Sequence, residues 1–205
     1  MRFNDRHGAG HLQREPELSV QDTDLLKRLN AYLDTFEQHL QQGQGWLIFN
    51  SAQRRGDRIV RLLLERLALY RPFFSFYHLP WRDFALHAYV SAIALPRDAS
   101  SVEEDGDDSP RRREFAIASS VANATALQLA HADLVILSNI APAQPHETIA
   151  LTRTAVERAA GGRAVIALTR HDPWSLAEAF EAADPSGTTW RHFYGTMQQT
   201  SLIAH

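Results

Sequence analysis

The stretch from Gly45 to Val60 constrains the fold more than any other part of this chain. Trp46 to Phe49 form an apolar run long enough for one buried strand. A polar loop follows, and a helical pattern opens at about Asp57. A strand, a tight loop and a helix in this order are the layout of a phosphate-binding loop, although other α/β proteins also contain them. The stretch therefore favours an α/β fold.

The loop has the spacing of the motif G-x-x-x-x-G-K-[ST] but lacks most of its chemistry. Ser51 stands at the first glycine and Gly56 at the second, while Asp57 replaces the lysine and Arg58 the hydroxyl residue that holds Mg²⁺. That lysine neutralises phosphate charge, so a carboxylate in its place repels the ligand. One reversed charge pair at about 4 Å is worth roughly 4 kcal/mol in a medium of intermediate dielectric. An acid near a helix N-terminus also suits the helix dipole, which is a purely structural reason for Asp57.

Composition excludes several classes of function. The chain has 205 residues and a formal net charge of −3, so its overall charge gives no reason to expect nucleic-acid binding. It has no cysteine, which rules out disulfides, thiolate metal sites and cysteine nucleophiles. The first residues lack the apolar segment of a secretory signal, and no run approaches the ~20 apolar residues of a membrane span. We therefore expect a cytoplasmic protein without membrane contact.

Helical and strand patterns alternate along the chain. Residues 1–20 are polar and predict an irregular arm, followed by one α/β domain at 21–205. Such alternation predicts a mostly parallel sheet covered by helices on both faces, with ligands at the carboxyl ends of the strands. Helices are expected at 22–42, 57–70, 81–94, 114–130, 146–160 and 173–183, and strands at 46–49, 73–77, 133–139, 163–169 and 200–204.

Residues 96–113 break this pattern. An acidic run between Glu103 and Asp108 is followed by the three arginines Arg111 to Arg113. Such a segment buries too little apolar surface to offset the entropy lost on ordering. We expect a charged, mobile loop here.

Several segments resemble the AAA+ core of bacterial helicase loaders and of the related ATPase subunits of insertion-sequence transposases. They are Leu26 to Phe36, Gly43 to Phe49, Ala132 to Leu137, Arg163 to Thr169 and Asp172 to Phe180. The resemblance covers about residues 22–205 and lies in the order and spacing of the segments. It implies a three-layer P-loop NTPase-like (AAA+-like) fold, with Ala132 to Leu137 as the Walker B strand and Arg163 to Thr169 as the sensor strand.

The chain departs from this family at its charged positions. Ser138 and Asn139 replace the paired acids that hold Mg²⁺ and polarise water, and neither carries the charge that this role needs. Arg170 replaces the asparagine that closes the sensor strand. We therefore expect no catalytic residue, no metal site and no bound ATP or ADP. The degenerate nucleotide site consists of Ser51, Arg54, Arg55, Gly56, Asp57, Arg58, Ser138, Asn139 and Arg170.

Three functions remain open. The one we favour is a catalytically inactive AAA+-like protein that acts through protein–protein interaction. The resemblance implies partners in DNA replication or transposition, such as an AAA+ paralogue or a replicative helicase. The second is a nucleotide-binding protein or ATPase whose arginines replace the usual phosphate site, because arginine binds phosphate bidentately. The third is a nucleic-acid-binding module that uses Arg111 to Arg113 and the arginines of the loop after Ser51, with Trp81 or Trp190 for base stacking. The near-neutral charge and the adjacent acidic run count against this third function.

Overall fold

The computed structural model describes residues 20–35, 38–39, 42, 44–51, 53–70, 74–93 and 110–202. The chain divides into two compact units, Met1–Asp34 and Thr35–His205. Helix α1 (Val20–Asp34) is the described element of the first unit. The predicted helix at 22–42 is therefore interrupted, because α1 ends at Asp34. The predicted arm lies outside the described residues except for Val20, as does most of the predicted charged loop.

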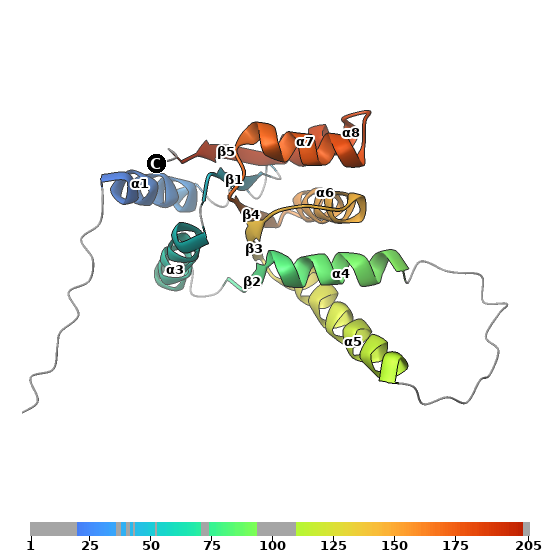
Figure 1. The fold of residues 1–205 in the computed structure, drawn as a ribbon. Helices are drawn as coiled ribbons and strands as arrows, with labels where there is room; N and C mark the ends of the chain where they lie inside the picture. The colour runs from blue at the N-terminus through green and yellow to red at the C-terminus, as the bar shows by residue number, and fades with distance from the viewer. Residues whose placement is uncertain are drawn as a thin grey trace, which may run out of the picture. The chain divides into compact units, whose positions relative to one another are not determined.

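A five-stranded sheet forms the centre of the second unit (Figure 1). Its strands lie in the order β2-β3-β4-β1-β5, and every neighbouring pair is parallel. The three inner strands are buried along almost their whole length, as expected where helices cover both faces of a sheet. The strands are β1 (Gly45–Phe49), β2 (Phe76–Pro80), β3 (Leu134–Ile140), β4 (Ala164–Thr169) and β5 (Met197–Ser201).

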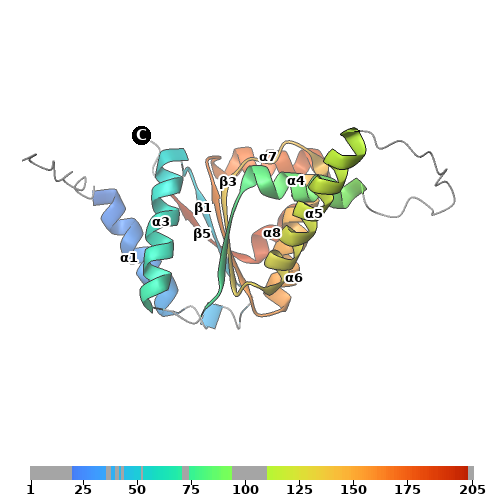
Figure 2. The same ribbon diagram turned by 90° about the horizontal axis from the view of Figure 1, so that it is seen from below.

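Helices of the second unit cover both faces of this sheet (Figure 2). Helix α3 (Gln53–Tyr70) lies on one face, and α4 (Trp81–Ile93), α6 (Pro145–Ala160) and α8 (Thr188–Gly195) lie on the other. Helices α5 (Pro110–His131) and α7 (Pro173–Ala183) complete this second layer. The arrangement makes the carboxyl ends of the strands one edge of the molecule, where the sequence places its candidate site.

Alternation along the strands builds a core on each side of the sheet. Successive strand residues point to opposite faces. Leu47 and Phe49 of β1 belong to the core cluster that also contains Phe84 of α4 and Phe180 of α7. Trp46 and Ile48, also buried, face the layer of α3 instead. The buried side chains of that helix are Ile59, Val60, Leu63 and Leu67.

The ends of the predicted elements need several corrections. Strands β2 and β5 lie three residues away from their predicted positions at 73–77 and 200–204, and α8 was not predicted. Helix α5 begins at Pro110, so Arg111 to Arg113 are helical and not part of a loop. By contrast, α7 begins as its sequence suggests, because the Asp172 carboxylate accepts hydrogen bonds from the backbone N–H groups of Trp174 and Ser175.

The close packing of β1 against its neighbours depends on Gly45. A Cβ atom at this position would overlap the backbone oxygen of Val165 and lie 2.8 Å from Sδ of Met197. Since the backbone oxygen cannot turn away, we expect Gly45→Ala to lower the free energy of unfolding by about 1–3 kcal/mol.

Gly195→Ala is the matched control, because a Cβ there meets no heavy atom within 4 Å. It should leave stability unchanged or raise it by up to ~1 kcal/mol through helix propensity. Urea denaturation of both variants measures the difference. Equal stabilities would show that β1 and β4 are not packed as described.

Candidate functional site

The junction between β1 and α3 is held to the end of β4 by Ser51. Its backbone N–H and its hydroxyl both donate to the carbonyl oxygen of Thr169, each over 2.9 Å. The residue is 1% exposed. Its hydroxyl is therefore committed to the neighbouring strand and does not face an open site.

The preceding residue turns the chain sharply. Asn50 has a φ of 58°, in the left-handed region where asparagine is tolerated better than most residues. Its backbone N–H donates to the carbonyl of His171, and its side-chain amide donates to the carbonyl of Leu202. The junction is thus fixed against the ends of both β4 and β5.

Helix α3 begins one turn earlier than the sequence predicts. It starts at Gln53, whereas the phosphate-loop spacing predicted Asp57. In an α-helix each N–H bonds to the carbonyl four residues before it, so the N–H groups from Asp57 onward are used within the helix. Only residues 50–52 separate β1 from α3. The loop predicted at Ser51 to Gly56 is therefore wrong from Gln53 onward, because its last four residues are helical.

Gly56 lies inside the first turns of α3 and is buried. A Cβ atom there would be 3.7 Å from Oδ1 of Asn139 and 3.8 Å from Oγ of Ser51. The structure thus brings together these three residues of the predicted site. The distances are ordinary van der Waals contacts, so the packing would accept an alanine at position 56.

Asn139 occupies an irregularity near the end of β3. The register with β4 shifts between Leu137 and Ile140, and Asn139 has a φ of 59°. The carbonyl of Ile140 accepts a hydrogen bond from the Thr169 hydroxyl over 2.8 Å. Thr169 therefore ties the end of β3 to the junction at Ser51.

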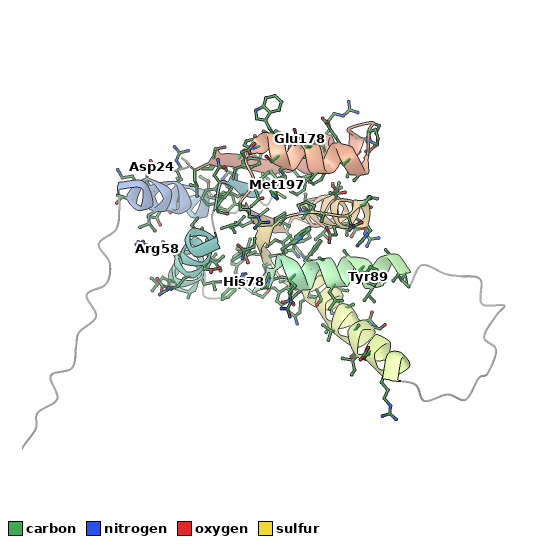
Figure 3. All side chains as sticks on the ribbon, in the orientation of Figure 1. Asp24, Arg58, His78, Tyr89, Glu178 and Met197 are labelled. Carbon is green, nitrogen blue, oxygen red and sulfur yellow. The ribbon has the colours of Figure 1, made fainter. Side chains whose placement is uncertain are left out.

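Ser138 contacts a histidine that the predicted site did not include. Its Oγ lies 2.9 Å from Nε2 of His78 on β2, and Ser138 is 2% exposed. Burial lowers the pKa of His78, and the carboxylate of Asp57 partly raises it. Asp57 itself is exposed. Figure 3 labels His78 and also Arg58, which follows Asp57 in α3.

The predicted arginines are distributed around this edge. Arg54 and Arg55 lie in the first turn of α3, but their side chains are outside the described part of the chain. Arg58 is half-buried, and Arg170, directly after β4, is exposed. A convergence of these four side chains on one ligand therefore stays a prediction.

Thr169 and His78 are the residues that sequence reasoning missed at this site. Thr169 closes a buried strand and has no motif of its own, so its role follows from pairing between strands distant in sequence. His78 is a polar residue in an edge strand, and that position gives a weak signal for a polar contact.

Within the described ranges, no three His, Asp or Glu side chains are grouped closely enough to hold a metal ion. None of the described helices is long and apolar enough to cross a membrane.

Comparison with known proteins supports the fold. No protein-family model and no curated protein sequence matches the chain. Its structure is similar to the crystal structure of a DNA replication initiation factor, with a TM-score of 0.56 and 10% identity over 91% of this chain and 47% of that one. The Orc1 protein of Aeropyrum pernix in complex with DNA gives a TM-score of 0.47 and 11% identity over 86% of this chain and 45% of that one. The chain thus spans less than half the length of either neighbour.

The predicted fold class is confirmed: an α/β, P-loop NTPase-like (AAA+-like) fold with a parallel sheet between two helical layers. At this level of identity the likeness concerns the fold alone. The narrower resemblance to helicase loaders and transposition ATPases stays a prediction.

The environment of His78 predicts that acid destabilises the protein. Because its pKa is lower in the folded chain than in the unfolded one, stability is complete above the ordinary histidine pKa of about 6.5 and is lost as the pH falls toward the folded value. Burial lowers the pKa of His87 and His171 in the same direction.

We expect the urea midpoint to fall between about pH 7 and about pH 5, and to fall less in His78→Gln, which keeps a polar atom near Ser138 but does not titrate. Urea titrations across this range measure the difference. An identical pH dependence in the variant would mean that His78 is not held in its neutral form.

Proposed function

We propose that this protein acts by binding other proteins on an AAA+-like scaffold and does not hydrolyse ATP. The observation that carries the proposal is the pair of hydrogen bonds from Ser51 to Thr169. These bonds and the early start of α3 leave only residues 50–52 between β1 and the helix. The longer loop, whose consecutive backbone N–H groups would surround a phosphate, is therefore absent between β1 and α3.

The side chains at the strand ends support the same conclusion. Asp57, an exposed carboxylate one turn inside α3, adds negative charge near this edge, where phosphate binding needs a cation. Ser138 is neutral and already in contact with His78, and Asn139 is neutral too. Neither supplies the negative charge that holds Mg²⁺ beside a nucleotide. The residues present therefore do not fit ATP with Mg²⁺, and no catalytic step is assigned to them.

The proposed partners belong to DNA replication or transposition. One structural neighbour is a DNA replication initiation factor, and the sequence resembles helicase loaders and transposition ATPases. An AAA+ paralogue or a replicative helicase is the partner that this combination favours. Direct binding of nucleic acid is not favoured, because the net charge of the chain is negative.

An exposed apolar stripe on α4 is the surface that we assign to this partner. Leu86, Tyr89 and Ile93 are spaced three and four residues apart, which places them on one side of the helix. Each is between 42% and 53% exposed, and Figure 3 labels Tyr89 near the far end of α4. Large apolar side chains gathered on one helical face are typical of protein-binding surfaces.

The absence of ATP binding can be tested directly. Calorimetric titration with ATP and Mg²⁺ should give no binding heat, and the protein should release no phosphate from ATP. Asp57→Lys restores the charge but not the loop, so it should not bind ATP either. Binding of ATP by Asp57→Lys would show that the charge at position 57 alone determines whether ATP binds. Turnover by the natural chain that is lost in Arg54→Gln, Arg55→Gln or Arg58→Gln would contradict the proposal.

The α4 stripe gives a second prediction. Leu86→Glu and Ile93→Glu should each weaken binding to a purified replicative helicase or AAA+ paralogue by roughly tenfold or more, the usual effect at the centre of an interface. Leu69→Glu on α3 is the control, since Leu69 is also apolar and exposed. Surface plasmon resonance compares the three variants. An equal loss in Leu69→Glu would rule out a specific role for α4.

A further inference from the structure

A cationic cavity lies between α4, α5 and α6, at the edge of the sheet opposite the strand ends described above. It has a volume of about 380 Å³, and Arg163 at its wall directly precedes β4. Three arginines, Arg153, Arg158 and Arg163, line it together with Glu157 and His87. The volume falls in the range of roughly 300–1,000 Å³ that is usual for small-molecule sites.

Arg158 is the structural member of this group. It is buried, and its guanidinium donates to the carbonyl oxygens of Leu129, Ala132, Asp133 and Ala164. These oxygens belong to the end of α5 and to the starts of β3 and β4. One of its two Nη1 hydrogens is left without an acceptor among the described residues. Arg158 therefore fixes the floor of the cavity and keeps little capacity for a ligand.

Arg153 and Arg163 are the members that can reach a ligand. Arg153 is exposed on α6, and Arg163 is half-buried and donates one hydrogen bond, to the carbonyl of Ala130. In the described part of the chain, neither forms an ion pair with a carboxylate. The guanidinium groups of Arg153 and Arg163 each carry five N–H donors, and most of these donors have no protein acceptor among the described residues.

The charges around the cavity are unbalanced. The carboxylates facing the arginines are Glu157, which lines the cavity and is exposed, and Asp133, whose Oδ2 already accepts two hydrogen bonds from Ser75. Burial lowers the pKa of Arg158 to about 10, and the positive charge of Arg163 contributes to this shift. A bound anion would relieve that repulsion.

The remaining walls define the shape of a ligand. Ala126 and Leu129 of α5 provide an apolar side. His87 has its Nδ1 3.1 Å from the carbonyl of Ala122, so in its neutral form the Nε2 atom is the acceptor. Burial lowers the pKa of His87 and so favours that neutral form. The cavity therefore offers cationic donors, the Nε2 acceptor of His87 and an apolar wall.

We propose that this cavity binds a small phosphate-bearing molecule, with its phosphate between Arg153 and Arg163 and its apolar body against α5. A phosphate monoester carries a charge of about −1.5 to −2 near neutral pH, which matches two guanidinium groups better than a carboxylate does. Arginine also binds phosphate oxygens through two parallel hydrogen bonds. Nε2 of His87 accepts a hydrogen bond from a hydroxyl of the same molecule.

Calorimetry with phenyl phosphate tests the proposal, because this probe combines a phosphate with a small apolar ring. The intact chain should bind one equivalent. Arg153→Gln and Arg163→Gln should each weaken binding by roughly tenfold or more, since each removes charge-assisted hydrogen bonds. Glu157→Gln should tighten binding, because it removes the opposing carboxylate. Arg153 and Glu157 are exposed, so these two variants test the cavity without disturbing the core.

Two further variants control the result. Arg82→Gln on α4 removes an exposed arginine outside the cavity and should leave the affinity unchanged. Arg170→Gln removes an arginine at the strand ends. The proposal is overturned if the folded chain does not bind phenyl phosphate, if binding depends on Arg170 and not on Arg153, or if benzoate binds as tightly. The last result would assign the cavity to carboxylates.

Discussion

The two hydrogen bonds from Ser51 to the carbonyl of Thr169 are the constraint on which the rest of this edge depends. They join the end of β1 to the end of β4, and the Thr169 hydroxyl extends the connection to Ile140 of β3. These three strand ends are held together, α3 begins at Gln53, and Gly56 packs against Ser51 and Asn139. Contacts between strand ends and an early helix start thus stand in place of the longer loop that the sequence predicted.

Arginine has two different roles in the second unit. Arg158 is buried, and its guanidinium satisfies carbonyl oxygens at the end of α5 and at two strand starts. Leaving those acceptors unpaired in the interior would be costly. Arg153 and Arg163 line the same cavity, and they donate far fewer hydrogen bonds to the described residues than Arg158 does. The charge of Arg158 therefore stabilises the fold. The positive charges of Arg153 and Arg163 are not fully neutralised by carboxylates among the described residues.

Sequence reasoning succeeded where burial alone decides the structure. The apolar runs that became β1, β3 and β4 were located to within one residue, since a strand covered on both faces must be apolar throughout. The edge strands were harder to place. Half-exposed β2 follows an aromatic run that suggested an earlier start, and β5 is the polar segment Met197–Ser201, which joins the sheet mainly through backbone hydrogen bonds to β1.

The amino-acid sequence by itself determined the fold class and the identity of the residues at the strand ends, because hydrophobic periodicity and the order of elements are local properties. It also placed Asp57, Ser138 and Asn139 at one edge of a parallel sheet. Only the tertiary structure decided where α3 begins, that Ser51 bonds to Thr169, and that Ser138 meets His78. These contacts join residues 60 to 118 positions apart. Such contacts depend on strand register and helix packing, which no local pattern specifies.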